Sequence, residues 1–397
     1  MRAAAVAALV SAALACGCGG DDEAGPPNRI APVGEAAAGG GSGQAPRGSS
    51  TGASSGSGAA GSGSTGVPRL TLAQLAGQHV VFPFAGPAVP AALERRIRRG
   101  EVAGVVLFAR NVGPPAQVRA LTARLQRIPR PAGLRAPLLV AIDQEGGPVR
   151  RLPGAPTRTP QQLAGAGSAG LARAQGRATA RTLRAAGVNV DFAPVLDVPR
   201  PGGAIAREGR GLGTTPAAVG RVGVAFARGL QDGGVAASAK HFPGFGAAAL
   251  NTDDGVATIG LPAATLRRVD GAPFAAAVQA GVRTVMVASA RYPALSAMPA
   301  SLSARVVRGE LRERLGFRGV TVTDDLETPA FAAYGGAPGA AVRAARAGMD
   351  LLLCAQSNDG AARTAAAVES ALRRGALSRR DLEAGLERVL ALRESVQ

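Results

Sequence analysis

From residue 68 onward, short apolar runs of strand type alternate with longer stretches in which Ala, Leu and Arg recur at helical spacing. The apolar runs are unbroken, which is typical of parallel strands covered on both faces, and the stretches between them are long enough for crossover helices. Eight such runs are present: HVVFPF (79–84), GVVLFA (104–109), PLLVAID (137–143), VNVDFA (188–193), VAASAK (235–240), TVMVAS (284–289), GVTVTD (319–324) and MDLLLC (349–354).

Eight strand–helix units within residues 68–397 predict an α/β fold with a single domain, a (β/α)₈ barrel of TIM type. A doubly wound open sheet is the competing architecture. In a barrel, the residues that carry chemistry lie on the loops that follow the strands. Those loops are therefore expected to hold the functional side chains.

Three of the runs lead into polar residues that suit one shared pocket: Asp143-Gln144-Glu145, Lys240-His241 and Asp324-Asp325. A single polar group at a strand end is ordinary helix capping, but acids and a Lys–His pair at corresponding ends indicate a site. Lys240 is also the only lysine among 45 basic residues. A compact ammonium was kept at this position, and it differs in shape and hydration from the planar guanidinium of arginine.

The first 18 residues are predicted to be an export signal. One basic residue precedes an apolar run that is too short to span a bilayer permanently. Small residues before Cys16 and Cys18 also resemble a bacterial lipoprotein signal, in which the cysteine is lipidated, and the choice between the two cysteines stays open. The alternative is a plain secretory signal with incidental cysteines.

Residues 19–67 are rich in Gly, Ser and Pro and are predicted to be a disordered tether, because this composition cannot bury enough apolar surface to fold. A lipid, a tether and a folded domain together predict an exported protein, lipid-anchored to the cell membrane and facing the envelope.

The formal net charge of +18 raises the question of nucleic-acid binding. The arginines are dispersed, aromatic residues make up only 3% of the chain, and no run combines the two for base stacking. Nucleic acid is therefore not an expected partner. Anionic envelope polymers or lipid head groups suit this charge better.

Several segments together resemble glycoside hydrolase family 3, specifically its single-barrel β-N-acetylhexosaminidase branch. The resemblance covers roughly residues 70–393, and its segments occur in the family's order: GVVLFARN (104–111), AIDQEGGPVRRL (141–152), VNVDFAPVLDV (188–198), SAKHFPGFG (238–246), VMVASARYPAL (285–295), PASLSARVVRGELRERLGFRGVTVTDDLE (299–327) and AARAGMDLLL (344–353). The resemblance is more specific for fold and family than for substrate.

The resemblance implies roles for individual residues. The first acid of the Thr-Asp-Asp segment, Asp324, would be the nucleophile that holds the glycosyl group covalently. The alternative role for Asp324 is a helix N-cap, which Asp325 could fill equally well. Asp143, Lys240, His241 and Arg210 would bind sugar hydroxyls, and Asn251 is counted with them as a substrate-binding residue. The arginine lies in Arg210-Gly211-Leu212-Gly213, where the family usually has Arg-Ser-Phe-Gly.

The proton-donating loop departs from the family. Members of this branch usually carry Asp-Ser-His after Lys-His-Phe-Pro-Gly, and the final histidine is the proton donor. Here Asn251 stands at the position of the aspartate and Asp253 at that of the histidine. In one interpretation Asp253 is the general acid/base, its pKa raised by burial or by a neighbour such as Asp254, and Asn251 orients it. In the other, the loop has lost proton transfer and the protein is a weak hydrolase or only binds glycan.

We therefore predict a retaining exo-glycosidase, a monomer, that releases terminal β-linked N-acetylhexosamine from peptidoglycan or chitin-type fragments. No metal is expected, since two histidines and one cysteine in the barrel region offer no ligand cluster, and no strand–GxGxxG–helix motif points to an organic cofactor. The alternatives are a family 3 β-glucosidase, which would commonly need a further sandwich domain, and a catalytically weakened glycan-binding lipoprotein.

Overall fold

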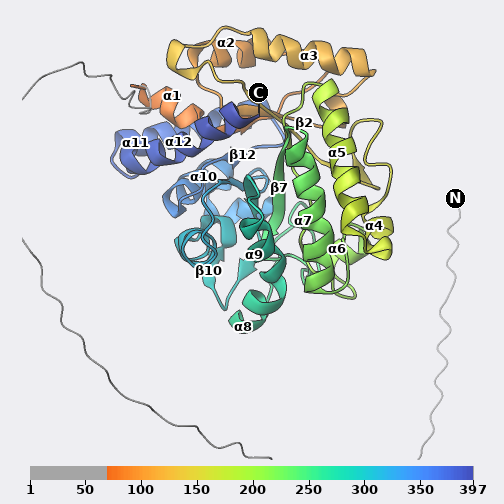
Figure 1. Ribbon diagram of the computed structural model, residues 1–397. Helices are drawn as coiled ribbons and strands as arrows, with labels where there is room; N and C mark the ends of the chain where they lie inside the picture. Colours follow the sequence, from red (N-terminus) through yellow and green to blue (C-terminus); the bar gives the residue numbers. More distant parts are fainter. Residues whose placement is uncertain (1–68, 397) are drawn as a thin grey trace, which may run out of the picture. The chain divides into compact units, whose positions relative to one another are not determined.

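The computed structural model describes residues 69–396. The predicted signal (1–18, with Cys16 and Cys18) and the predicted tether (19–67) lie outside the described residues. Within them, the eight predicted strand runs form one parallel sheet with helices packed around it (Figure 1). Its strands are β1 (Val80–Phe82), β2 (Gly104–Leu107), β3 (Leu139–Ile142), β6 (Val190–Asp191), β7 (Ala236–Phe242), β8 (Thr284–Val287), β11 (Val320–Thr323) and β12 (Leu352–Leu353).

The sheet closes into a barrel. Its order is β11-β8-β7-β6-β3-β2-β1-β12, so each strand lies beside the next strand of the barrel along the chain. The two end strands meet where Val322 pairs with Leu351 in parallel. The Leu351 N–H donates to the Thr321 carbonyl at 2.9 Å, and the Thr323 N–H donates to the Leu351 carbonyl at 3.0 Å. The predicted (β/α)₈ barrel is confirmed, and closure excludes an open sheet.

Helical segments cover the outside of the barrel and connect its strands (Figure 1). The α-helices are α1 (Leu72–Gly77), α2 (Ala91–Arg99), α3 (Pro115–Arg127), α4 (Pro160–Ala166), α5 (Ala169–Ala185), α6 (Ala204–Arg207), α7 (Pro216–Asp232), α8 (Ala263–Thr265), α9 (Ala272–Gln279), α10 (Gly336–Ala347), α11 (Asn358–Arg373) and α12 (Arg379–Ser395). Four 3₁₀ helices are also described: η1 (Ala109–Asn111), η2 (Ala132–Leu134), η4 (Ala300–Leu302) and η6 (Pro329–Tyr334). Two helical segments have the wider π geometry: η3 (Leu266–Asp270) and η5 (Arg305–Arg314).

Small residues let this aromatic-poor chain pack its helices closely. Helix α7 begins after Thr215, whose hydroxyl accepts from the Ala218 N–H at 3.2 Å. It lies against α5 through Gly176 and Gly229, where an added Cβ would come within 2.2 Å of a backbone oxygen of the other helix. Close backbone approach thus replaces the aromatic side chains that the composition lacks.

Two small hairpins extend the loops after the strands. β4 (Gln144–Gly146) pairs with β5 (Val149–Arg150) just beyond β3, and β9 (Arg291–Tyr292) pairs with β10 (Ser296–Pro299) beyond β8. None of the helices within residues 69–396 has the length and apolar character needed to cross a membrane.

A buried arginine ties the last helix to the amino-terminal end of the barrel. Arg393 on α12 is fully buried, and its guanidinium donates to the Gln78 side chain at 2.7 Å and to the Pro137 carbonyl at 2.6 Å. It also donates to the carbonyls of Leu134 and Ala136. Burial lowers the pKa of Arg393 to about 9, so the side chain is still charged at neutral pH. The charge is offset by oriented carbonyl dipoles.

Replacing Arg393 with methionine should lower the free energy of unfolding by about 3 kcal/mol, because several buried carbonyls and the Gln78 amide lose their donor. Urea unfolding at neutral pH measures the change. Arg380→Met on the same helix is the matched control, since Arg380 is exposed and should change stability by less than about 0.5 kcal/mol. Equal stabilities for the two variants would contradict this interpretation.

Candidate active site

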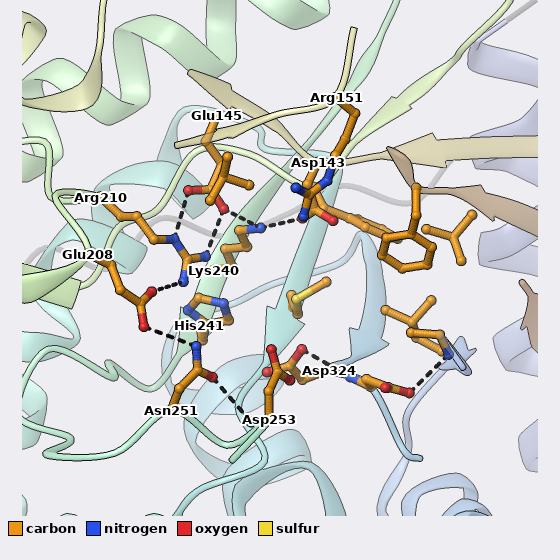
Figure 2. A pocket seen from close by; sticks show the side chains of 18 of the residues that line it. Asp143, Glu145, Arg151, Glu208, Arg210, Lys240, His241, Asn251, Asp253 and Asp324 are labelled. Atoms are coloured by element: carbon orange, nitrogen blue, oxygen red, sulfur yellow. Dashed lines mark hydrogen bonds and ion pairs between the residues drawn. The ribbon is translucent and has the colours of Figure 1, made fainter. Parts of the chain in front are cut away.

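A cavity of about 390 Å³ opens at the carboxyl ends of the barrel strands. This volume lies in the range of small-molecule sites. All seven residues singled out from the sequence line it: Asp143, Arg210, Lys240, His241, Asn251, Asp253 and Asp324. The sequence-based expectation that separate strand ends share one pocket agrees with this geometry (Figure 2).

Lys240 lies between two carboxylates (Figure 2). It is near the end of β7, where the pairing with β8 becomes irregular, and both Lys240 and His241 line the cavity. Its Nζ is 2.6 Å from Asp143 Oδ1 and 2.7 Å from Glu145 Oε1. Burial by itself would lower the pKa of Lys240, but the two carboxylates outweigh it and raise that pKa. The ammonium is therefore a fixed charge.

Glu145 connects this lysine to Arg210. The guanidinium of Arg210 is bidentate on Glu145, with Nη2–Oε1 at 2.7 Å and Nε–Oε2 at 2.9 Å. Burial alone would raise the pKa of Glu145, but the charges of Lys240 and Arg210 outweigh it and hold that pKa at about 2. Both cations are thus neutralised within the protein before any ligand arrives.

A further acid interacts electrostatically with the lysine. Asp191 on β6 is fully buried, and one carboxyl oxygen accepts from the Gln144 N–H at 2.9 Å. Burial raises the pKa of Asp191 to about 8. Protonated at neutral pH, this side chain adds no third negative charge to the pair around Lys240.

His241 is held by a buried acid. Its Nδ1 is 2.8 Å from Asp197 Oδ2, and its backbone N–H donates to Asp197 Oδ1 at 3.1 Å. The Phe245 N–H donates to the same Oδ1 at 2.6 Å. With Nδ1 committed to Asp197, Nε2 is the ring nitrogen that remains for a ligand.

Asp324 follows β11 directly and faces the same cavity (Figure 2). Its backbone N–H donates to the Val287 carbonyl at 3.2 Å, which fixes the residue at the strand end. The next residue, Asp325, is occupied otherwise: it accepts from the backbone N–H groups of Glu327 and Ala355, each at 3.0 Å. Burial raises the pKa of Asp325 to about 7. The two neighbouring acids therefore differ in role, and only Asp324 is available to a ligand.

Asp253 lines the same cavity, and its side chain lies near that of Asp324 (Figure 2). Although the residue as a whole is exposed, partial burial of its carboxyl group and then the charge of Asp324 raise its pKa. Asp254, the neighbour suggested by the sequence, makes only a smaller contribution. Asn251, which the sequence suggested as the residue that orients Asp253, contacts it through the backbone, by accepting from the Asp253 N–H at 3.2 Å.

Sequence reasoning left three site residues unassigned: Glu145, Asp197 and Glu208. Glu145 lies two positions after Asp143, so a signal was present in the segment already singled out. Asp197 carries no local sign of its contact with His241, 44 positions away, and Glu208 carries none of its contact with Asn251, 43 positions away. Within residues 69–396, no group of three or more His, Cys, Asp or Glu side chains is arranged to hold a metal ion.

Comparisons with known proteins agree with the fold. Residues 70–392 match the family model described as the glycosyl hydrolase family 3 N terminal domain. An uncharacterized secreted glycosyl hydrolase from Arthroderma benhamiae is 36% identical over 333 residues, covering 81% of this chain and 93% of the relative. A beta-hexosaminidase from Xanthomonas oryzae pv. oryzae is 36% identical over 265 residues, covering 65% and 77% of the two chains.

Solved structures give the same result. A family 3 β-N-acetylglucosaminidase from Paenibacillus sp. str. FPU-7 is similar with a TM-score of 0.78 and 37% identity, covering 83% of this chain and 63% of that chain. A β-N-acetylhexosaminidase from Beutenbergia cavernae is similar with a TM-score of 0.76 and 30% identity, covering 82% and 99%. The family predicted from the sequence is confirmed, and this chain belongs to glycosyl hydrolase family 3.

Proposed function

We propose that this chain is a retaining exo-glycosidase that hydrolyses terminal β-linked N-acetylhexosamine in peptidoglycan or chitin-type fragments. The observation that carries the proposal is that Asp324 and Asp253 line one cavity with a paired cluster of sugar-binding charges. Relatives named as beta-hexosaminidases support the glycosidase class and the sugar. Most glycosidases work with two carboxyl groups of this kind.

The charged cluster would bind the sugar. Asp143 accepts hydrogen bonds from hydroxyls, while Lys240, Arg210 and His241 Nε2 offer donors or acceptors to others. Because their charges are already paired, these groups can receive a neutral polyhydroxylated ring without leaving an uncompensated ion behind.

Asp324 would act first. Its carboxylate attacks the anomeric carbon, and the bond from that carbon to the departing oxygen breaks, with its electron pair going to the oxygen. Asp253 protonates the same oxygen, for which a raised pKa is the required state. Water then attacks the glycosyl-enzyme and gives its proton to Asp253, which restores both acids as the sugar leaves.

We also propose that the enzyme works in the cell envelope, held by a lipid on Cys16 or Cys18, with residues 19–67 as the tether. This rests on the pattern of residues 1–18. A relative named as a secreted glycosyl hydrolase supports export.

Asp324→Asn should lower kcat/KM for p-nitrophenyl N-acetylglucosaminide by roughly three orders of magnitude or more, because the nucleophile is lost. In the unmodified protein, a slow fluorinated glycoside should label the peptide that contains Asp324, as shown by mass spectrometry. The corresponding p-nitrophenyl glucoside is the control for the sugar. If neither the unmodified protein nor the variant turned over these glycosides, the result would favour a protein that only binds glycan.

Asp253→Asn should impair glycosides with poor leaving groups by about 10² to 10⁴-fold and spare activated aryl glycosides in the first step. In the unmodified enzyme, activity should fall as pH rises through the pKa of Asp253, because the acid must carry its proton. The raised pKa of Asp253 moves this alkaline limb of the pH–activity profile to higher pH. The limb should be absent from the profile of the Asp253→Asn variant. If the variant and the unmodified enzyme had equal rates on both substrate types, Asp253 would have no part in the mechanism.

Fatty-acid labelling of the full chain expressed in a bacterial host tests the anchor. Cys16→Ser and Cys18→Ser are compared, and one of them should abolish the label while the other keeps it. Retention of the label in both single variants and its loss only in the double variant would contradict a single lipidated cysteine.

A further inference from the structure

The loop that carries Asp253 follows β7. The first half of this loop is hydrogen-bonded to the segment around α6. Three hydrogen bonds do this: Arg200 N–H to the Gly246 carbonyl at 3.2 Å, Ala204 N–H to the Ala248 carbonyl at 2.8 Å and Arg207 Nη2–H to the Ala249 carbonyl at 2.8 Å. The contact between Glu208 and Asn251 comes next. Within the described chain, the next hydrogen bond from this loop to another segment is at Ala257, which accepts from the Arg291 N–H. Asn251 is thus the last anchor before Asp253.

Both ends of the Asn251 amide are in use. Its Nδ2 donates to Glu208 Oε1 at 3.1 Å, and its Oδ1 accepts from the Asp253 N–H at 3.2 Å. A carboxylate can only accept hydrogen bonds, so Glu208 determines that the NH₂ end of the amide faces it. The oxygen end is therefore left pointing at the backbone of Asp253.

Glu208 also contacts the sugar-binding cluster. Its Oε2 is 2.9 Å from Arg210 Nη1, and Arg210 is in turn bidentate on Glu145. Between the two residues, Gly209 adopts a left-handed conformation with φ of 68°, which turns the chain after α6. Glu208 and Arg210 consequently both line the cavity, as Figure 2 shows.

We infer that Glu208 is a positioning residue: through Asn251 it sets the place of Asp253 relative to the sugar held by Arg210. The inference rests on the proposed function and adds to it a link between the site that binds the sugar and the loop that protonates the leaving group. A shift of about 1 Å in a reacting group can cost on the order of 10²-fold in rate. One link of this kind therefore has a measurable effect.

The ion pair between Glu208 and Arg210 adds little to stability. The Glu208 side chain is 34% exposed, and partly exposed ion pairs are weak. Removing it should consequently change catalysis far more than unfolding. Its hydrogen-bond polarity offers a specific test, since donor and acceptor can be exchanged between positions 208 and 251.

The experiment compares Glu208→Gln, Asn251→Asp and the double variant in the full chain. In Glu208→Gln, the new amide cannot accept well from both Arg210 and Asn251. In Asn251→Asp, two carboxylates face each other. In the double variant, the amide at position 208 can accept from Arg210 and donate to the carboxylate at position 251, which again accepts from the Asp253 N–H.

Two substrates separate leaving-group protonation from sugar binding: N,N′-diacetylchitobiose, with a poor leaving group, and 2,4-dinitrophenyl N-acetylglucosaminide, with a good one. Each single variant should lose about 10- to 100-fold in kcat/KM on the disaccharide and less than about threefold on the aryl glycoside. The double variant should recover to within about threefold of the unmodified enzyme. Glu387→Gln, an exposed glutamate on α12, should change neither rate.

Equal losses on both substrates would overturn the inference, because they would place Glu208 in sugar binding or in folding alone. So would unchanged rates in the single variants, or a double variant no better than either. Thermal unfolding is measured for every variant. If Glu208→Gln does not fold, the rates of Asn251→Asp and the double variant can still be compared. Absence of a fluorinated-sugar label on Asp324 in the unmodified enzyme would instead reject the proposed function.

Discussion

The active-site end of this barrel depends on one buried ammonium group. A charge removed from water costs several kcal/mol unless oppositely charged groups and hydrogen bonds replace the lost solvent. Lys240 meets that requirement with Asp143 and Glu145, both from the segment after β3. The pairing links segments 97 positions apart along the chain, and Arg210 extends it through Glu145. The buried Asp191, whose pKa of about 8 keeps it protonated at neutral pH, adds no further negative charge to the cluster.

This electrostatic arrangement needs the closed barrel around it. The short apolar strands end at one common rim, and the carboxyl ends of β3, β7 and β11 and the loops after them can therefore place their polar residues around one cavity. Small side chains on helices such as α5 and α7 draw the outer layer close, which compensates for a chain with few aromatic residues. Arg393 secures the opposite rim, where the last helix meets the segments before β1 and β3. Scaffold and site are thus stabilised at separate ends.

The sequence was most informative about the positions of the strands and the residues that end them. All eight strands could be located because a parallel barrel strand is apolar on both faces, and residues at strand ends such as Asp324 follow from that pattern. Pairwise roles were harder. Asp197 contacts His241 and Glu208 contacts Asn251, each more than 40 positions away, and no periodicity encodes such a partner. Asn251 was placed in the correct loop, but its contact is with the backbone of Asp253, which depends on the fold of the loop itself.

The single lysine of the chain has a chemical consequence as well. The other 44 of the 45 lysine and arginine residues are arginines, so Lys240 is the only side-chain primary amine. It is almost completely buried and held protonated by its carboxylate partners. Acylating reagents attack neutral, accessible amines, and on the folded barrel they find no such side chain. Lysine-directed chemistry on this protein therefore reports whether the charge cluster around Lys240 is intact, and not how much surface is exposed.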